Sequence, residues 1–589
     1  MRQVLLGLAA ALSLAEAASA AEGGCQLQKV ADLPVTMAGL KPHVPAKING
    51  RDVVLVADSG AFFSMLGEAN AKRLGLSRGM TPPGMRVRGV GGTAPVKVGV
   101  ADRFELSGGV LTNVDFLVGD LAPGSRADGI LGQNVLGVLD VEYDFANGAI
   151  RLFKPQGCEK ARLAYWAGDK PVNVLSFRAT TPSEPHVIAN ASVNGRPIRV
   201  MFDTGAFRSV LEQSTAERLG FRPDGPGVEY GGLSGGIGPR RLENWIAPFA
   251  EFAIGEEKIQ NTRLRVAPIT LPKADMLLGA DFFLSHRILI SNSQDRVYFT
   301  YNGGPVFRLE PVEGGPEEPA QVAGAADEPK DADGYHRRAA ASLARADHVR
   351  AIADFTRAIE LEPRRAIHLR QRAAAHLASG DPAAARRDLD AALALAGGDV
   401  EARLMRGELR LSAGDADGAA EDFARATASP ASGPGVRARI AQAWLAAGKA
   451  GEAVAQYDVL LAGAPPPPVR AAVLASRCQA RALVRTDLAL ALADCEAALK
   501  IAARDPSALA ARGLVHLQSA RLEAAQADFD AALKRDPRHA QALYGRSLVL
   551  RRQGRAAEAD ADARAAQAVW PQIAAIAARY ELGSPAGGP

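Results

Sequence analysis

Residues 53–66, VVLVADSGAFFSML, return 145 positions later as residues 198–211, IRVMFDTGAFRSVL. In both copies a run rich in β-branched residues ends in a carboxylate, which is Asp58 in the first copy and Asp203 in the second. Because Val and Ile favour strands, each acid is predicted to lie in the loop that directly follows a strand. Two acids in matched settings indicate a shared role.

The duplication extends well beyond the two acids. An Asn-Gly-Arg segment precedes each acid, and a glycine-rich segment and an apolar segment ending in glycine follow it. The paired segments are residues 49–51 and 194–196, 89–92 and 231–236, and 129–132 and 276–279. Asn-Gly between alternating apolar runs is a strong hairpin signal. The sequence therefore predicts two all-β units, residues 21–160 and 186–301, joined by a linker over residues 161–185.

Each unit resembles a retropepsin-like aspartic peptidase domain, as found in the bacterial relatives of retroviral proteases. The resemblance rests on Asp-Ser-Gly at 58–60 with Ile-Leu-Gly at 130–132, and on Asp-Thr-Gly at 203–205 with Leu-Leu-Gly at 277–279. One such tripeptide alone is weak evidence. Two copies in register, each with its strand, turn and distal glycine, make the resemblance specific.

The resemblance implies roles for individual residues. Asp58 and Asp203 would form a catalytic dyad, and the hydroxyls of Ser59 and Thr204 would brace the two loops against each other. The glycines that give these loops room would be Gly60, Gly132, Gly205 and Gly279. The glycine-rich segments resemble flaps that close over an extended peptide, and the candidate flap or substrate residues are Gly91, Gly92, Tyr230 and Gly232.

Such a dyad explains why two carboxylates are needed. A water held between them attacks the peptide carbonyl while one acid protonates the amide nitrogen, so no metal or other cofactor is expected. Two carboxyl groups about 3 Å apart cannot both ionise, and they therefore share a proton. The nine His residues are scattered and show no spacing typical of a metal site.

The leading interpretation is an exported aspartic endopeptidase whose two units pair within one chain. A retropepsin is a dimer in which each subunit gives one acid, so pairing between two chains is the alternative arrangement. A peptidase-shaped binding module without activity is the alternative function, because fold does not imply function. Self-processing of the chain's own linker would need the same dyad.

The N-terminus has the features of a secretory signal over residues 1–20. Arg2 provides the positive end, residues 4–14 the apolar core, and Ala-Ser-Ala at 18–20 a small-residue cleavage site near Ala20. The predicted location is therefore periplasmic or secreted. No later apolar run reaches the roughly 18 residues of a membrane span, so no span is expected.

Four cysteines in an exported chain favour two disulfides. Cys25 and Cys158 bracket the first β unit, while Cys478 and Cys495 lie 17 residues apart in a helical region. Alignment of the helical repeats described below places Cys478 on the helix that faces Cys495, which favours that bridge. Four buried free thiols are the alternative.

The charge balance gives no support for a nucleic-acid partner. The chain has 69 Lys and Arg against 65 Asp and Glu, a net charge of +4, and no long run of one sign.

The second half of the chain changes character. Residues 302–334 are rich in Pro, Gly, Glu and Ala, which predicts a linker, and residues 335–582 form an Ala-rich helical region with a period of 34. The marker positions of that period are Phe355, Leu389, Phe423, Tyr457, Cys495, Phe529 and Ala563. The region resembles a tetratricopeptide-repeat solenoid of about seven copies. The resemblance implies a groove that binds a peptide, a protein substrate or a protein partner; a spacer or oligomerisation arm is the alternative.

Overall fold

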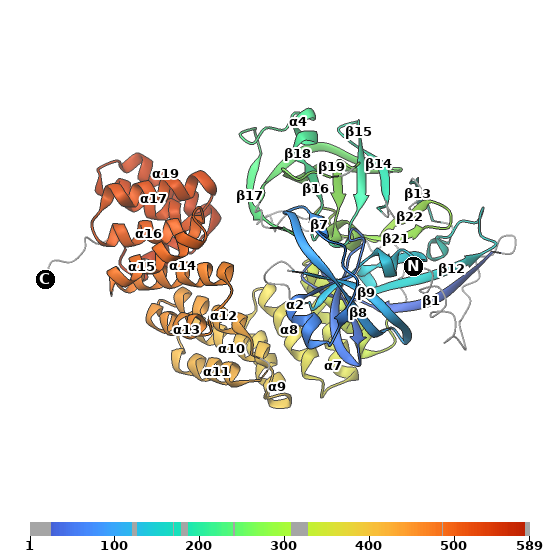
Figure 1. Ribbon diagram of the computed structural model, residues 1–589, viewed down its shortest axis with the longest axis horizontal. Helices are drawn as coiled ribbons and strands as arrows, with labels where there is room; N and C mark the ends of the chain where they lie inside the picture. Colours follow the sequence, from blue (N-terminus) through green and yellow to red (C-terminus); the bar gives the residue numbers. More distant parts are fainter. Residues whose placement is uncertain are drawn as a thin grey trace. The chain divides into compact units, whose positions relative to one another are not determined.

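The fold is known from a computed structural model. It describes residues 25–119, 127–168, 170–177, 186–238, 242–271, 273–307, 328–430, 432–485 and 487–582. The predicted signal over residues 1–20 lies outside these ranges. Contacts between residues divide the chain into two compact units, residues 1–380 and 381–589, and each is described by itself. Figure 1 shows the strands in blue to green and the repeat helices in yellow to red.

The two sequence copies fold into two sheets whose equivalent strands have the same order, and the first sheet carries the additional strands β2 and β6. In the first sheet the order is β2-β3-β4-β10-β5-β9-β8-β6, and in the second it is β14-β15-β20-β16-β19-β18-β17. The strands of the first sheet are β2 (Thr36–Ala38), β3 (Lys41–Ile48), β4 (Arg51–Ala57), β5 (Met65–Gly67), β6 (Ser77–Arg78), β8 (Gly92–Leu106), β9 (Gly109–Gly119) and β10 (Gly129–Leu131), with β7 (Arg86–Gly89) paired to β8. Those of the second are β14 (Ile188–Val193), β15 (Arg196–Phe202), β16 (Val210–Glu212), β17 (Glu229–Ser234), β18 (Leu242–Ile254), β19 (Glu257–Ala267) and β20 (Met276–Leu278).

Short helices follow equivalent strands in the two copies. They are α2 (Glu68–Arg73) and α3 (Gln133–Leu136) in the first copy, and α4 (Gln213–Arg218) and α5 (Ala280–Ser285) in the second.

The Asn-Gly turns set the register of the strand that leads to each acid. Asn49 and Gly50 have φ of 50° and 75°, and Asn194 and Gly195 have φ of 50° and 73°. Two consecutive residues with positive φ are the signature of a tight hairpin turn that suits Asn-Gly. Ile48 therefore pairs with Arg51. The side chains of β4 then alternate between the two faces of the sheet, and its last residue, Ala57, lies beside Leu131 of β10.

The strands that close each copy do not complete two separate units. They join in one six-stranded sheet of order β1-β12-β11-β21-β22-β13 (Figure 1). Its strands are β1 (Gln26–Pro34), β11 (Asp140–Asp144), β12 (Ala149–Gln156), β13 (Asn173–Ser176), β21 (His286–Ser291) and β22 (Arg296–Tyr301). Val141 of the first copy pairs with Ile290 of the second, and Tyr143 pairs with Ile288. Pairing removes the exposed edge that each copy would otherwise present to solvent.

The region expected to be a linker, residues 161–185, is ordered in part. Its described residues include a single helical turn at Tyr165–Ala167 and strand β13, which pairs with β22. Leu163 and Ala167 are buried in a small cluster with the Cys25–Cys158 disulfide. This strand could not be predicted from its own sequence because its partner belongs to the second copy, at least 120 residues away.

One hydrophobic core runs through both copies. Phe104 and Val118 of the first copy, Phe202 and Phe252 of the second, and Tyr143 of the shared sheet belong to the same buried cluster. Across the interface the rings of Tyr143 and Phe283 meet edge to face, with centroids 5.2 Å apart. The two acid loops are thus carried by a single packed body.

Helix α6 packs on this β body. It contacts β2 and the single helical turn Phe145–Asn147, and a Cβ on Gly148 would lie 2.4 Å from Cβ of Arg337 on α6. Helices α6 (Ala332–Ala344), α7 (His348–Leu361) and α8 (Ala366–Ala378) therefore belong to the first compact unit. The sequence predicts that the helical region begins at residue 335; α6 begins at Ala332 and is packed on the β body.

The second unit consists of paired antiparallel helices. They are α9 (Pro382–Leu395), α10 (Val400–Ser412), α11 (Ala416–Ala428), α12 (Pro434–Ala446), α13 (Ala450–Ala462), α14 (Pro467–Val484), α15 (Leu488–Ile501), α16 (Pro506–Gln518), α17 (Leu522–Arg535), α18 (Ala540–Arg552), α19 (Ala556–Val569) and α20 (Ile573–Arg579). A Cβ on Gly407 would lie 2.4 Å from the Phe423 ring, which explains the small residue in the first helix of a repeat. Cys478 of α14 is bonded to Cys495 of α15.

A largely buried or partly buried ion pair accompanies the helical period. In several repeats an Arg of the first helix binds, through two nitrogens, an Asp located 16 residues later on the second helix. These pairs are Arg338–Asp354, Arg406–Asp422, Arg512–Asp528 and Arg546–Asp562. None of the helices in the described residues combines the length and the apolar character needed to span a membrane.

Candidate active site

The two acid loops meet at the centre of the β body. Asp58 follows β4 and Asp203 follows β15. The backbone N–H of Asp58 donates to the carbonyl of Leu131 at 3.0 Å, and that of Asp203 donates to Leu278 at 2.9 Å. Each loop is therefore held by the short strand that ends in the distal glycine motif.

Two buried hydroxyls lock the loops together. The Ser59 N–H donates to Oγ1 of Thr204 at 2.9 Å, and the Thr204 N–H donates to Oγ of Ser59 at 3.0 Å. Each hydroxyl in turn donates to the carbonyl before the opposite acid, Ser59 to Phe202 at 3.0 Å and Thr204 to Ala57 at 2.9 Å. All four bonds cross between the copies, so both hydroxyls and both N–H groups have a partner in the opposite loop.

Each carboxylate is oriented by its own loop. Oδ1 of Asp58 accepts from the N–H groups of Gly60 at 2.9 Å and Ala61 at 2.8 Å. Oδ1 of Asp203 accepts from Gly205 at 2.9 Å and Ala206 at 3.1 Å. The two acid side chains also hydrogen-bond each other.

The glycines after the acids are needed because each carboxyl packs on the other loop. A Cβ on Gly60 would lie 2.4 Å from Cγ of Asp203, and a Cβ on Gly205 would lie 2.1 Å from Cγ of Asp58. Real Cβ atoms do not approach other atoms so closely, so no larger residue fits at either position without moving the dyad. This reciprocal contact places the two acids next to each other.

The environment favours a protonated pair. Burial first, and then the negative charge of Asp203, raises the pKa of Asp58 above its usual range. Burial also raises the pKa of Asp203, while the N–H groups of Ala206 and Gly205 oppose that rise. The hydrogen bond between the two side chains raises the pKa of Asp58 and lowers that of Asp203. The pair therefore retains a proton at higher pH than a lone Asp side chain does.

The distal glycines lie directly behind the loops. A Cβ on Gly132 would be 2.6 Å from the carbonyl carbon of Phe63, and a Cβ on Gly279 would be 2.6 Å from that of Arg208. Their N–H groups donate to the hydroxyls of Ser64 and Ser209, at 3.0 and 2.9 Å. Gly132 and Gly279 therefore allow a strand to pass close beneath each acid loop.

Two residues after each distal glycine a polar side chain also holds the acid loop in place. The type of this side chain differs between the copies. Oδ1 of Asn134 accepts from the N–H and hydroxyl of Ser64 at 2.7 and 2.9 Å. The carboxylate of Asp281 accepts from the same groups of Ser209, and burial raises the pKa of Asp281. The two copies use an amide and a carboxyl group for the same task.

The glycine-rich segments form two hairpin tips that touch. The Gly91 N–H donates to the Ile237 carbonyl at 3.1 Å, and a Cβ on Gly238 would lie 2.4 Å from the backbone of Gly91. Val90 packs with Leu242, Ala267 and other residues of the second copy. Ile237 packs with residues of the first copy, including Val96 and Leu117.

The predicted flap residues take different places in these hairpins. Gly91 makes the contact between the tips, and Gly92 has φ of 118° beside it. Gly232 has φ of 87° and lies at an irregularity in the pairing of β17 with β18 rather than at the tip. Tyr230 lies on β17 with its ring against Trp245, centroids 6.3 Å apart. The sequence analysis missed Val90 and Ile237, although a lone apolar residue among glycines marks both tips.

The family comparison agrees with this geometry. The aspartyl protease family model matches residues 44–135 and 189–282, the two stretches that carry the acid loops and the distal glycines. The tetratricopeptide repeat model matches residues 370–435, 404–468 and 510–573. The chain carries two aspartyl protease domains followed by tetratricopeptide repeats.

Comparison with solved structures finds tetratricopeptide repeat proteins. A repeat protein from Parabacteroides merdae is 13% identical, with 43% of this chain and 98% of that chain covered and a TM-score of 0.37. PilF of Pseudomonas aeruginosa is 15% identical, with 37% and 97% covered and a TM-score of 0.27. No curated protein matches the sequence.

Tyr143 is a further residue of the protease domains that the sequence analysis did not single out. It is buried in the shared sheet, and its pKa is raised first by burial and then by the charge of Asp58, while a hydrogen bond with the Ser59 side chain opposes the rise. In the shared sheet Val141 pairs with Ile290 and Tyr143 pairs with Ile288. This pairing is symmetric, so Ile290 occupies in the second domain the position that Tyr143 occupies in the first. The second domain therefore has an isoleucine where the first has this phenol.

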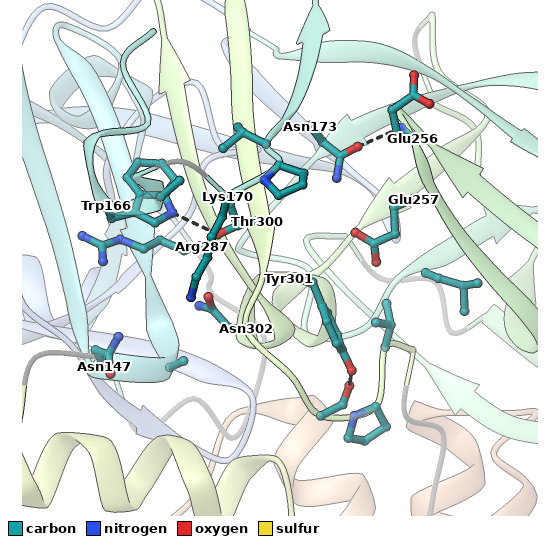
Figure 2. A pocket seen from close by; sticks show the side chains of 18 of the residues that line it. Asn147, Trp166, Lys170, Asn173, Glu256, Glu257, Arg287, Thr300, Tyr301 and Asn302 are labelled. Atoms are coloured by element: carbon teal, nitrogen blue, oxygen red, sulfur yellow. Dashed lines mark hydrogen bonds between the residues drawn. The ribbon is translucent and has the colours of Figure 1, made fainter. Parts of the chain in front are cut away.

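A cavity of about 790 Å³ lies in another part of the first unit (Figure 2). Its described lining comes from the shared sheet, the turn between β18 and β19, residues 304–306 and the first repeat helices, and from neither acid loop. Its polar groups largely bind one another: Trp166 donates to Thr300 at 2.9 Å, and the Arg287 guanidinium stacks on the Trp166 ring at 4.8 Å.

Proposed function

We propose that this protein is an aspartic endopeptidase that hydrolyses peptide bonds with a water activated between Asp58 and Asp203. The observation that carries the proposal is the reciprocal seating of the two carboxyl groups, each oriented by two N–H groups and each packed on the glycine of the opposite loop. Both acids come from one chain, so the proposal needs no second copy.

The residues support a balanced reaction. The Asp203 carboxylate takes a proton from the water as its oxygen bonds to the peptide carbonyl carbon, and Asp58 gives its proton to the carbonyl oxygen. In the second half Asp203 returns its proton to the amide nitrogen as the C–N bond breaks, and Asp58 regains a proton from the hydroxyl of the intermediate. The dyad ends as it began, and one water has been consumed.

The flaps define how substrate enters. In this structure the tips are joined by the bond from Gly91 to Ile237 and by the exchange of Val90 and Ile237 between domains. An extended peptide must part these tips to reach the acids, and glycines on both sides of each tip make that movement sterically simple. Closure afterwards would exclude bulk water from the dyad.

We further propose that the repeats bind the protein substrate or a protein partner, and that the protein works outside the cytoplasm. Solenoids of helical pairs present an extended surface suited to peptides and proteins. Both cysteine pairs are bonded, Cys25 with Cys158 and Cys478 with Cys495, which suits an oxidising compartment. These bonds and the signal-like N-terminal sequence are what support export.

The test is cleavage of an unbiased peptide library between about pH 4 and 7 by wild type, Asp58→Asn and Asp203→Asn. The proposal expects cleavage by the wild type and its loss in both single variants, with all three proteins folded. If the folded wild type cuts nothing, the protein is a binding module with a peptidase fold, and the repeat region becomes the place to look for its ligand.

A further inference from the structure

The last described segment of the second unit, residues 573–582, contacts a repeat far earlier in the sequence. Tyr580 Oη donates to the carbonyl of Leu445 at 2.9 Å, and Arg579 Nη1 donates to that of Ala446 at 2.6 Å. Both acceptors lie at the end of α12, 135 and 133 residues earlier in the chain. We call residues 573–582, which comprise α20 and the residues that follow it, the tail.

The next repeat along the chain from α12 also holds the tail. Arg485, which follows α14, donates from Nη2 to the carbonyl of Glu581 at 2.5 Å. Leu483 of α14 and Ala450 of α13 lie in the buried cluster that contains tail residues, and Val484 packs on that cluster. The fourth and fifth repeats, counted from α6, therefore make the docking surface of the tail. The residues of this docking surface are Leu445, Ala446, Ala450, Leu483, Val484 and Arg485.

The tail is buried along one face of its helix. Ile573, Ala577 and Tyr580 are buried and lie at positions i, i+4 and i+7, which share one side of an α-helix. Ala575 and Ala578 lie between them in the sequence and are exposed. Anchors at this spacing are the mode by which an amphipathic helix binds a groove on another protein. The tail therefore contacts the repeats as a bound peptide would.

The repeat architecture by itself does not require these contacts. In a solenoid each repeat contacts its neighbours in sequence, and α20 does contact α18 and α19 of the seventh repeat. The bonds to α12 reach the fourth repeat, three repeats before that one. They use carbonyl groups at the end of a helix, which lack the regular partner within the helix and carry partial negative charge. A guanidinium and a phenol are donors that suit such acceptors.

The order of the tail depends on its docking. A helix of seven residues is too short to form by itself in water. Burial first, and then the charge of Glu452 on α13, raises the pKa of Tyr580 to about 12, so the phenol stays protonated at neutral pH and donates to α12. A segment that is ordered only by such contacts can be exchanged for another segment with the same pattern.

We propose that the docking surface is an interaction site for a short helical segment of a protein partner, and that the tail occupies it as an internal ligand until the partner's segment takes its place. By the pattern of the tail, that segment has a large apolar residue, a small residue and a tyrosine at positions i, i+4 and i+7, with Arg or Lys before the tyrosine. The inference rests on the proposed role of the repeats in binding a protein and makes no use of the dyad.

The test measures, by fluorescence anisotropy, how tightly a labelled peptide with the sequence of residues 571–582 binds the full chain. A release variant, Arg579→Ala with Tyr580→Ala, removes both bonds to α12. A locked variant, Gly448→Cys with Arg579→Cys, joins the tail to the turn after α12 by a disulfide. A Cβ on Gly448 would lie 3.7 Å from that of Arg579, and about 3.8 Å is usual for a disulfide.

Two control proteins and a second peptide accompany these variants. Ala575→Ser changes an exposed residue of α20 and should leave the tail docked. Gly448→Cys alone carries the same backbone strain as the locked variant, because Gly448 has φ of 82°. The second peptide carries Tyr580→Phe and lacks the phenol hydroxyl.

The release variant should bind the peptide at least about tenfold more tightly than wild type, because the tail of the wild type competes for the surface and lowers the apparent affinity. The locked variant should bind at least about tenfold more weakly than wild type. Ala575→Ser and Gly448→Cys should bind like wild type. The Tyr580→Phe peptide should bind the release variant roughly two- to tenfold more weakly than the parent peptide, because it loses one hydrogen bond.

Three outcomes would overturn the inference. The first is a release variant that binds the peptide no more tightly than the locked variant does. The second is a release variant whose loss of helix, measured by circular dichroism, extends beyond the tail, which would make the tail a structural part of the solenoid. The third is a wild type that sediments as a dimer and that Tyr580→Ala converts to a monomer, which would assign the surface to the tail of a second copy.

Cleavage of the peptide library by the same proteins keeps the two proposals apart. If the labelled peptide binds as expected while the wild type cuts nothing, the endopeptidase proposal fails and the docking surface stands. If the wild type cuts the library while the release variant does not bind the labelled peptide, the docking surface is wrong and the endopeptidase proposal stands.

Discussion

The two protease domains share a backbone and differ in what surrounds it. The acid, the hydroxyl brace, the two glycines and the loop N–H donors are the same in both copies, down to the hydrogen-bond pattern. Around them, the first copy has the buried Tyr143 where the second has Ile290, and an amide supports one loop where a carboxyl group supports the other.

This difference shows which features the dyad requires from both halves. Seating two carboxyl groups against each other needs matched backbone geometry on both sides, because each loop supplies the space for the other. The electrostatic surroundings need no such symmetry. A single-chain pair is free to diverge there, whereas a dimer of identical subunits is not.

The largest expected effect is a loss of kcat/KM when the space that each loop leaves for the opposite carboxyl group is filled. Gly205→Ala would place a methyl group 2.1 Å from Cγ of Asp58, and Gly60→Ala would do the same to Asp203 at 2.4 Å. Displacing a reacting group by about 1 Å lowers the rate by roughly 100-fold, so each variant should lose at least about that much kcat/KM. Gly398→Ala is the matched control, since its added methyl would meet nothing within 4 Å. Activity near the wild-type value in Gly205→Ala would contradict the packed dyad.

The hydroxyl brace should give the next largest effect, on stability. Thr204→Val leaves the buried Ser59 N–H without its acceptor, and Ser59→Ala does the same to the Thr204 N–H. Each change should lower the free energy of unfolding by about 1–3 kcal/mol, measured by urea denaturation. Thr204→Ser keeps the hydroxyl and should lose much less. Because the four bonds form one network, the double variant should lose less than the sum of the single variants, and strict additivity would argue against the brace.

The pH dependence of stability separates the dyad from the rest of the protein. The folded state holds a proton on Asp58 above the ordinary Asp pKa of about 3.9. Protonated Asp58 contributes fully to the free energy of unfolding below the ordinary Asp pKa of about 3.9. This contribution is lost as the pH rises through the raised pKa of Asp58 in the folded state. Asp58→Asn should remove this loss, so the variant should gain stability relative to wild type between pH 4 and 7 by about 1 kcal/mol or more. If the free energies of unfolding of the two proteins differ by the same amount at every pH in that range, the pair is not protonated.

The smallest effect should come from the asymmetric phenol. Tyr143→Phe removes a buried hydroxyl that hydrogen-bonds Ser59, at a cost of about 0.5–1.5 kcal/mol. Ile290→Val at the equivalent position should cost a similar amount, about 0.5–1.5 kcal/mol. The two variants should differ in the pH profile of kcat/KM, which Tyr143→Phe shifts and Ile290→Val leaves in place. Equal profiles would mean that the phenol acts only by packing.

Much of the site could be predicted because its signals are local. The strand before Asp58, the Asn-Gly turn and the glycines after the acids each act within a few residues, and the duplication repeats them at a fixed offset. The period of 34 in the helical half is equally local. These patterns were sufficient for the fold class, the two protease domains and the repeats, which the family comparison also finds.

The features that the sequence did not reveal are pairings between distant segments. The joining of β11 with β21 is invisible in either strand alone, as is the partner that orders β13. In the sequence Tyr143 looks like any other strand residue. Its hydrogen bond with the Ser59 side chain depends on the shared sheet. The exchange of Val90 and Ile237 at the flap tips likewise depends on how two separate hairpins meet.

The most direct test of the central claim is a mixing experiment with Asp58→Asn and Asp203→Asn proteins. If one dyad is built within each chain, each variant is inactive alone and the mixture, unfolded and refolded together, stays inactive. Recovery of peptide cleavage in the mixture would show that an acid of one chain meets an acid of another. Full activity of either single variant would show that the two acids do not work as a pair.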